Sequence, residues 1–302
     1  MNRSFNTIRD GYLRMKHSRV HYLEAGTGSA VVVLIHGGGS DCARLSWSPI
    51  VPALAKTYRV LAPDLPGYGE SDSIPLHNPI QDLANFLADF LQQLNIGSCH
   101  LVGLSMGGAI ALTFSLHHPE RVQSLTLLAS YGLGNYVPGG RISYWLSRKV
   151  WVTRAVRRLL KTSPLFLRYS LRNVIYNPRR ITRSFVREMQ HQLRRASDGS
   201  AWYRFIQSEL TPTGLRTIFP ADQLRRIPIP VLLLHGLEDR LIPYQFSQQA
   251  ARHLPLAELR LIPHCGHWIP RDAPQRLISI LETFLTTPSQ DQNPTESYET
   301  PE

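Results

Sequence analysis

Short apolar runs alternate with longer segments of helical periodicity along most of the chain. Several of the runs are apolar throughout, as expected for parallel strands that are covered on both faces. The predicted strands are Val20–Glu24, Val31–Ile35, Arg59–Ala62, His100–Leu104, Leu125–Ala129, Val231–Leu234 and Glu258–Ile262. Between them, apolar residues recur every three or four positions, for example from Leu83 to Leu94 and from Leu277 to Phe284. The alternation predicts an α/β protein with a doubly wound sheet.

The alternation stops between residues 132 and 220, where aromatic, leucine and arginine residues mix in helical patterns. We therefore predict an α/β core made of residues 1–131 and 221–287, with a helical insert at 132–220. Residues 288–302 are polar and acidic and lack periodic apolar positions, so we expect a disordered tail. A chain of 302 residues that is 43% hydrophobic is long enough to form one such domain with an insertion.

The positive charge of the chain is concentrated in the insert. The whole chain has 33 Lys+Arg against 22 Asp+Glu, a net charge of +11. The insert has 17 basic residues against Glu188, Asp198 and Glu209, so its net charge is +14 and that of the remainder is −3. An acidic remainder and the lack of any nucleic-acid-binding motif argue against nucleic acid as a partner.

The segment from Arg141 to Lys161 has the pattern of one basic amphipathic helix. Its apolar side would carry Ile142, Trp145, Leu146, Val152, Val156, Leu159 and Leu160. Its basic side would carry Arg148, Arg154, Arg157, Arg158 and Lys161, and we expect the last four to face away from the pocket. Two interpretations remain open: a helix that packs on the core and solvates its arginines, or one that lies on an anionic membrane surface.

The remaining composition favours a cytoplasmic protein, peripheral to a membrane at most. No stretch approaches the length of an apolar membrane span, and residues 1–9 lack the apolar run of a signal peptide. Cys42, Cys99 and Cys265 are too few and too scattered for a disulfide framework, and none lies in a zinc-binding pattern. We expect no metal and no cofactor.

The residues Gly103-Leu104-Ser105-Met106-Gly107 follow a predicted strand and open a helical segment, which is the context of a nucleophile elbow. Such a turn is sharp, so a side chain at Gly103 or Gly107 would collide with the neighbouring strand and helix. We predict that Ser105 is a nucleophile.

A serine nucleophile needs a base, and the base needs a carboxylate that orients it. His267 lies in a glycine-flanked loop after the last predicted strand; His264, three residues earlier, is the competitor. For the acid, Asp239 is favoured over Glu238, both of which follow the strand Val231–Leu234. The predicted catalytic residues are therefore Ser105, Asp239 and His267.

Acyl transfer also requires donors for the developing oxyanion. The strand Val31–Ile35 ends in His36-Gly37-Gly38-Gly39, whose backbone N–H groups can point into the site. We predict an oxyanion hole made by the N–H groups of Met106 and Gly38, with Gly39 as the alternative to Gly38. His36 is expected to brace this loop, and Gly37, Gly39 and Trp268 to support the site.

These motifs resemble those of the α/β-hydrolase superfamily, in the branch with a helical cap. The resemblance covers roughly residues 11 to 286 and includes the loop Asp64-Leu65-Pro66-Gly67-Tyr68-Gly69-Glu70-Ser71, expected to be structural. It implies an eight-stranded, mostly parallel sheet, the triad named above, and a cap formed by the insert.

The resemblance implies a small-molecule or lipid-like substrate and favours a carboxylic ester hydrolase. The S-M-G-G and G-H-W pieces also resemble hydrolases that cleave a carbon–carbon bond in vinylogous diketone acids, whose anionic substrates would suit an arginine-bearing cap. Leu104, however, stands where that branch usually has a polar residue. A third alternative is a ligand receptor or accessory protein of the same fold, with slow turnover or none.

Overall fold

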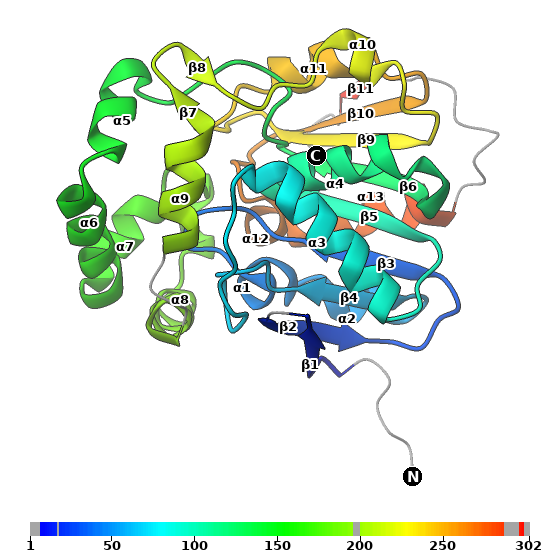
Figure 1. Ribbon diagram of the computed structural model, residues 1–302, viewed down its shortest axis with the longest axis horizontal. Helices are drawn as coiled ribbons and strands as arrows, with labels where there is room; N and C mark the ends of the chain where they lie inside the picture. The colour runs from blue at the N-terminus through cyan, green and yellow to red at the C-terminus, as the bar shows by residue number, and fades with distance from the viewer. Residues whose placement is uncertain (1–6, 17, 196–199, 287–295, 299–302) are drawn as a thin grey trace.

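A nine-stranded sheet forms the centre of the protein. The computed structural model describes residues 7–16, 18–195, 200–286 and 296–298, and the strand order is β1-β2-β4-β3-β5-β6-β9-β10-β11 (Figure 1). The strands are β1 Arg9–Met15, β2 Ser18–Ala25, β3 Val31–Ile35, β4 Arg59–Pro63, β5 Cys99–Leu104, β6 Val122–Leu128, β9 Val231–Gly236, β10 Ala257–Ile262 and β11 Glu296–Tyr298. Strand β2 is antiparallel to both β1 and β4, and the other neighbours are parallel.

All seven predicted strands are present, and two further strands extend the sheet at its edges. Strand β1 has no buried residue, so it lacks the apolar pattern that the prediction used. It supplies the eighth strand that the family resemblance implies. The ninth, β11, pairs with β10 and lies in the segment expected to be disordered. An edge strand offers unpaired N–H and C=O groups, which explains how a short polar segment can join it. Residues 288–295 and 299–302 lie outside the described part of the chain.

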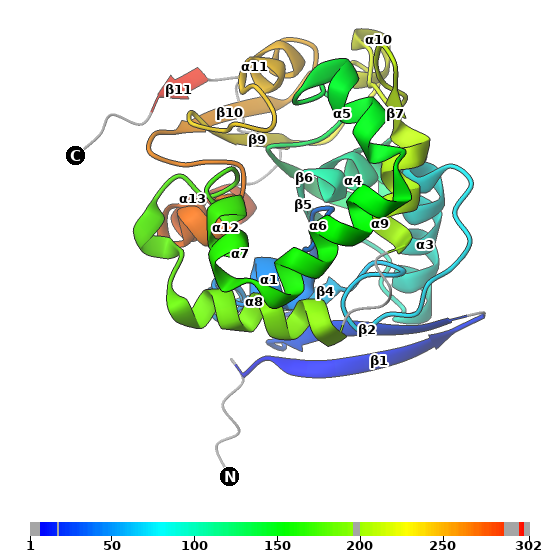
Figure 2. The same ribbon diagram turned by 90° about the vertical axis from the view of Figure 1, so that its left-hand side faces the viewer.

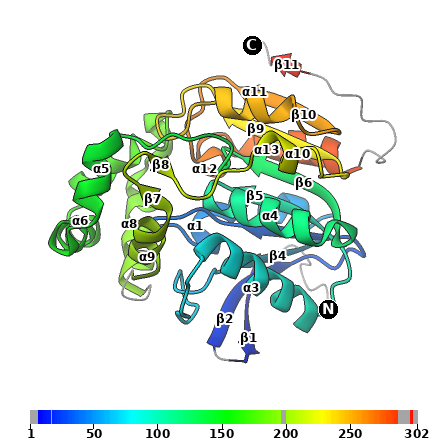
Figure 3. The ribbon, with the colours of Figure 1, turned by 45° about the horizontal axis from the view of Figure 1, so that its top comes forward.

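Helices cover both faces of the sheet, because successive strand residues point to opposite sides. On one face Val33 belongs to the same apolar cluster as Phe90, and on the other Val32 clusters with Leu281. The first face carries α3 Pro79–Gln93, α4 Met106–His117, α10 Ala221–Leu224 and α11 Gln245–Ala251. The second carries α1 Ala43–Trp47, α2 Val51–Leu54, α12 Ile269–Asp272 and α13 Pro274–Thr286 (Figure 3).

The insert forms a cap beside the sheet, and we use this name for residues 132–220. It contains α5 Gly140–Ser147, α6 Val150–Thr162, α7 Pro164–Leu171, α8 Arg183–Arg195 and α9 Ser200–Glu209 (Figure 2). The prediction of a purely helical insert missed one feature, the hairpin of β7 Leu210–Thr211 and β8 Gly214–Leu215. Two-residue strands are too short to show an alternating pattern.

The amphipathic segment from Arg141 to Lys161 is two helices and not one. Helix α5 ends at Ser147 and α6 begins at Val150, with Arg148 and Lys149 as the capping residues between them. The break changes the direction of the second helix, so one helical periodicity cannot describe both. Helices α5 and α6 contain no buried residue, whereas α7 and α8 bury Leu167 and Phe185, among others. None of the helices in the described ranges is both long and apolar enough to cross a bilayer.

A buried histidine fixes the loop that follows β4. His21 lies between two carboxylates, with Nδ1 at 2.7 Å from Asp64 Oδ2 and Nε2 at 2.8 Å from Asp10 Oδ1. Burial by itself would lower the pKa of His21, but the hydrogen bonds and charges of the two carboxylates outweigh it and raise that pKa. Asp64 also accepts the backbone N–H of Ala43, so the loop has the structural contacts expected of it.

Candidate active site

Ser105 occupies a strained turn between β5 and α4. Its φ is 53° and its ψ is −115°, a conformation that a residue with a side chain keeps only when its surroundings hold it. The N–H of Ser105 donates to the carbonyl oxygen of Leu128 at 2.9 Å. Its own carbonyl oxygen accepts from Gly108 at 2.9 Å and from Tyr131 at 3.0 Å. With a further bond from the N–H of Ala109 at 3.3 Å, four backbone hydrogen bonds hold the strained residue.

The two glycines of the elbow are sterically required. A Cβ at Gly103 would lie 2.4 Å from the carbonyl oxygen of Gly107, and a Cβ at Gly107 would lie 2.3 Å from that of Ile35. Both distances are far inside van der Waals contact, and the obstructing atoms are backbone. The spacing G-x-S-x-G thus follows from the close packing of β5, β3 and α4.

Asp239 and His267 are in direct contact. Asp239 Oδ2 lies 2.7 Å from His267 Nδ1, while Asp239 Oδ1 accepts the backbone N–H groups of Leu241 and Ile242 at 2.7 and 3.0 Å. A carboxylate only accepts, so Nδ1 carries the proton and Nε2 of His267 is left as the acceptor. These contacts fix both the position of the carboxylate and the tautomer of the ring.

The two competitors lie apart from this pair. Glu238 Oε2 accepts the backbone N–H of Cys265 at 2.9 Å. His264 is 65% exposed and lies 3.9 Å from Glu238 Oε1. The structure therefore brings the favoured residues Asp239 and His267 together, and turns Glu238 toward the backbone of the His267 loop.

His235 also contacts the carboxylate, and the sequence analysis did not assign it a role. Its Nε2 lies 3.0 Å from Asp239 Oδ2 and 2.9 Å from the carbonyl oxygen of Ile242, so Nε2 carries a proton. Its Nδ1 lies 2.8 Å from the hydroxyl oxygen of Ser247. Burial raises the pKa of Asp239, but the charge of His267 and the hydrogen bonds of both histidines outweigh it and hold that pKa well below its usual range. The only signal in the sequence was the place of His235 in the H-G-L-E-D piece.

The loop after β3 is braced as expected. His36 Nε2 accepts the backbone N–H of Leu65 at 3.0 Å, so its Nδ1 donates to the carbonyl oxygen of Gly37 at 2.7 Å. Among the described residues, no acceptor takes a hydrogen bond from the N–H of Gly38 or of Met106. A Cβ at Gly38 would lie 2.3 Å from the indole of Trp202, so the cap packs directly on this loop.

Asp41 was missed by the sequence analysis and links this loop to the His267 loop. Its Oδ2 accepts the N–H of Gly37 at 2.9 Å and the hydroxyl of Ser46 at 2.6 Å. The same hydroxyl oxygen accepts the indole N–H of Trp268 at 2.8 Å. Trp268, which we expected to support the site, is thus held beside the loop of Asp41. Burial raises the pKa of Asp41 in spite of these hydrogen bonds. No short motif surrounds Asp41, so the sequence carried no signal for it.

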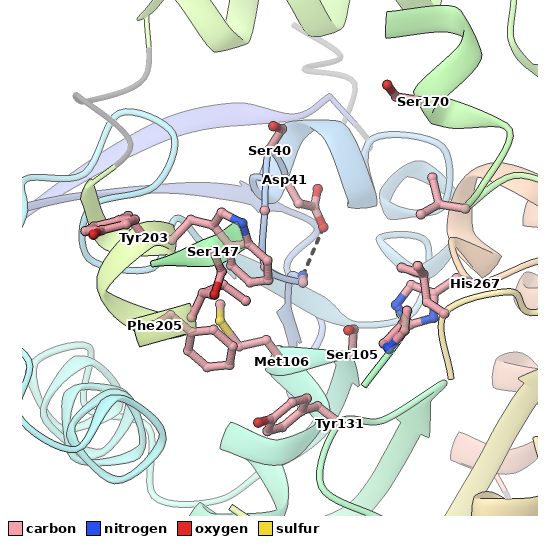
Figure 4. A pocket seen from close by; sticks show the side chains of 18 of the residues that line it. Ser40, Asp41, Ser105, Met106, Tyr131, Ser147, Ser170, Tyr203, Phe205 and His267 are labelled. Atoms are coloured by element: carbon pink, nitrogen blue, oxygen red, sulfur yellow. Dashed lines mark hydrogen bonds between the residues drawn. The ribbon is translucent and has the colours of Figure 1, made fainter. Parts of the chain in front are cut away.

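A cavity of about 1080 Å³ lies between the cap and the carboxyl ends of the strands. Ser105, Met106 and His267 line it, and Ser105 and His267 lie close together on one wall (Figure 4). The three predicted catalytic residues are thus assembled at one site, with Asp239 behind His267. Most of the other lining side chains are apolar or aromatic, among them Leu104, Leu146, Val156, Leu167, Phe205 and Phe246.

The basic residues of α6 correct one prediction. Arg154 and Arg157 line the cavity, although we expected both to face away from it. Arg158 is exposed, as predicted, and Lys161 is half-buried beside Arg157. The physical reason is that the side of α6 that faces the cavity carries Arg157 together with Val156 and Leu160, so the basic and apolar residues do not lie on opposite sides. Two cations therefore join Asp41 and His267 among the ionisable groups of the cavity wall.

The described part of the chain contains no cluster of side chains that could bind a metal ion. Within residues 7–16, 18–195, 200–286 and 296–298, no three or more His, Cys, Asp or Glu side chains gather as a metal site would require. Cys42, Cys99 and Cys265 are buried free thiols.

Comparisons with known proteins agree with this architecture. Residues 30–274 match the family model described as alpha/beta hydrolase fold. The chain is 31% identical over 287 residues to the 2-hydroxy-6-oxononadienedioate/2-hydroxy-6-oxononatrienedioate hydrolase of Burkholderia vietnamiensis, covering 93% of this chain and 94% of that one. A solved structure, the 2-hydroxy-6-oxo-6-phenylhexa-2,4-dienoate hydrolase of a Rhodococcus strain, aligns with a TM-score of 0.77 at 26% identity, covering 93% of this chain and 99% of that one.

A solved structure that is named for a different activity is similar to this chain as well. A membrane phospholipase A aligns with a TM-score of 0.74 at 25% identity, covering 94% of this chain and 87% of that one. The family match spans most of the chain, and it includes the elbow, both neighbouring loops and the cap. The chain belongs to the α/β-hydrolase family.

Proposed function

We propose that this protein is a serine hydrolase that cleaves an acyl bond through a covalent acyl-enzyme. Ser105 Oγ attacks a carbonyl carbon while His267 Nε2 takes the hydroxyl proton, and Asp239 stabilises the imidazolium that forms. The observation that carries this proposal is the 2.7 Å contact between Asp239 and His267 beside a serine on a strained elbow. Water then attacks the acyl-enzyme with His267 as the base, which releases the acid and restores Ser105.

The developing oxyanion is stabilised by two backbone N–H groups. Met106 N is the first N–H of α4, where the helix leaves its donors without partners of its own. Gly38 contributes the second donor from the loop after β3. His36 and Asp41 both hold that loop at Gly37: His36 Nδ1 donates to the carbonyl oxygen of Gly37, and Asp41 Oδ2 accepts the N–H of Gly37. The donors are therefore in place before the charge develops.

For the substrate, we propose an oxo acid whose carbon–carbon bond next to the ketone is cleaved. A carbon leaving group departs only if its electron pair is delocalised into a conjugated carbonyl, and His267 then returns the proton to it. The similar Burkholderia enzyme is named for such a conjugated dioate. Arg154 and Arg157 on the cavity wall give a substrate carboxylate a cationic partner.

Ester hydrolysis is the second candidate, and the residue before the nucleophile favours it. Leu104 is buried and lines the cavity, so the cavity wall beside Ser105 is apolar. A polar side chain at this position would help a carbon leaving group to depart. The similarity to a phospholipase A supports the same alternative. The catalytic steps are unchanged, with an alcohol in place of the carbon acid as the leaving group.

One pair of experiments tests the mechanism and the substrate separately. A fluorophosphonate probe should label the protein at Ser105, and Ser105→Ala should abolish both labelling and turnover while circular dichroism stays unchanged. Full labelling of that variant would remove Ser105 from the mechanism. A protein that is labelled but turns over no substrate in the panel below would be a receptor or accessory protein of this fold.

The panel contains a 2-hydroxy-6-oxo-dienedioate and p-nitrophenyl esters of increasing acyl length. We expect the oxo dioate to have the highest kcat/KM. The double variant Arg154→Gln, Arg157→Gln should raise KM for the dioate by about tenfold or more, since each lost charge-assisted hydrogen bond costs about 1.5 to 3 kcal/mol, and should leave a neutral ester unaffected. Turnover of the esters without turnover of the dioate would establish the second candidate instead.

A further inference from the structure

The outer surface of the cap exposes an unusual set of apolar side chains. Of the thirteen large hydrophobic side chains exposed within the described ranges, nine lie between Ile142 and Tyr169. We call these nine residues the cap patch: Ile142, Trp145, Leu146, Val150, Trp151, Val156, Leu159, Leu165 and Tyr169. The most exposed are Leu165 at 81% and Trp151 at 72%. A concentration of this kind marks an interaction surface, because isolated exposed apolar residues would be spread over the molecule.

Helices α5 and α6 leave much of their apolar surface uncovered. They form the outermost layer of the cap (Figures 1 and 2) and contain no buried residue. An amphipathic helix is stabilised mainly by burying its apolar side. On α6, Trp151, Ala155 and Leu159 follow each other at helical spacing and are all exposed. Part of the apolar surface of this layer is thus presented outward, while Val152 and Leu160 line the cavity.

The charge around the cap patch is entirely positive. The sequence has no Asp or Glu from Arg121 to Arg187, a stretch that includes all of α5, α6 and α7. Arg141, Lys149 and Arg158 are exposed on or beside these helices. None of the three takes part in an ion pair between described residues. Their natural counterpart is therefore an anionic surface outside the protein.

The cap patch is also connected to the cavity. Leu146, Val150 and Val156 are exposed, yet each of them lines the cavity as well. A molecule that reaches these side chains from outside therefore meets the inner wall of the site. The cavity is largely apolar. An apolar ligand can therefore pass from the cap patch into the cavity without being surrounded by water.

We propose that the cap patch docks onto an anionic lipid bilayer, with α5 and α6 lying in the interface and the cavity open toward the lipid. Tryptophan, leucine and arginine on one exposed helical layer are the composition of an interfacial helix. The arginines and the lysine meet lipid phosphates, while Trp145 and Trp151 enter the headgroup region. The proposal holds for either bond that the active site cleaves.

The test is co-sedimentation of the full chain with vesicles of phosphatidylcholine and increasing phosphatidylglycerol. Binding should rise with phosphatidylglycerol and weaken as salt is added. The double variant Trp145→Ser, Trp151→Ser should bind at least about tenfold more weakly. Its matched control is Ile218→Ser, another exposed apolar side chain of the cap that lies outside the patch.

A second pair of variants tests the charge. Lys149→Gln with Arg158→Gln should lower the affinity for phosphatidylglycerol vesicles by about thirtyfold, since each basic residue near the surface contributes about 1 kcal/mol. The control Arg225→Gln with Arg226→Gln removes the same charge from exposed positions after α10 and should leave binding within about twofold. All four variants should keep turnover of a small soluble substrate, because none of the seven residues lines the cavity.

Three results would overturn the proposal. The first is a failure of the parent protein to sediment with pure phosphatidylglycerol vesicles at low salt. The second is unchanged binding of both the tryptophan and the charge variants. The third is a dimer in sedimentation velocity that Trp145→Ser, Trp151→Ser dissociates, without vesicle binding by the parent, which would assign the cap patch to a second copy of the chain.

Discussion

Replacing Asp239 by Asn tests the geometry of the active site most directly. The substitution keeps the size of the side chain but removes its charge and one acceptor. Asn Oδ1 can still accept the backbone N–H groups of Leu241 and Ile242, which turns the amide NH₂ toward His267 Nδ1 and His235 Nε2. His235 Nε2 carries a proton because it also faces the carbonyl oxygen of Ile242. Two donors would then oppose each other, and His267 would be driven to the tautomer with its proton on Nε2, which cannot accept from Ser105.

The expected loss can be estimated from the distance. A carboxylate and an imidazolium 2.7 Å apart attract each other by about 6 kcal/mol at an effective dielectric constant of about 20. Part of this is recovered from solvent and neighbouring dipoles, so we expect a loss of about 4 to 6 kcal/mol in transition-state stabilisation. This corresponds to a decrease of about a thousandfold to twenty-five-thousandfold in kcat. The change should appear in kcat and in kcat/KM alike, because the interaction strengthens only as His267 becomes charged.

Glu238→Gln is the matched control for this variant. Glu238 is the adjacent residue, and its Oε2 accepts one backbone N–H, which a glutamine oxygen can also accept. Its effect on kcat should therefore stay within about tenfold. The assay is steady-state turnover with the best substrate of the panel, together with fluorophosphonate labelling rates for both variants. A larger loss for Glu238→Gln than for Asp239→Asn would refute the assignment of the acid.

Three further predictions concern the support of the site. Gly107→Ala should abolish labelling and lower Tm, because its Cβ would lie 2.3 Å from a backbone oxygen of β3, whereas Gly97→Ala, with open space around its Cβ, should change neither. His21 has a raised folded-state pKa, so its stabilisation is complete below its unfolded pKa of about 6.5 and is lost as pH rises through the raised value; urea unfolding should show this loss in the parent and not in His21→Gln. Asp41→Asn should reduce kcat by about tenfold to a hundredfold with little change in KM, since Gly37 loses a charged acceptor at 2.9 Å; a rise in KM alone would show that Asp41 contacts substrate instead.

Local order along the chain was determined by the sequence itself. The strand before Ser105 and the helix after it are encoded in consecutive residues, and the glycines on either side of the elbow are required by contacts that any such turn makes. The order of Ser105, Asp239 and His267 along the chain follows the same logic, because each lies just beyond a predicted strand. These predictions rest on periodicity and turn chemistry, which act over a few residues. Strand β1 escaped them because an edge strand buries none of its residues.

Only the tertiary structure decided which distant groups meet. Ser46 and Trp268 are 222 positions apart and share a hydrogen bond that connects the loop of Asp41 to the loop of His267. His235 and Asp239 are only four positions apart, but their contact still depends on how the loop after β9 folds back. In the cap, the packing of α6 put Arg154 beside the cavity and left Trp151 exposed. A periodic pattern states which side of a helix is apolar, but only the packing of neighbouring elements states where that side points, because burial is a property of the folded whole and not of the segment.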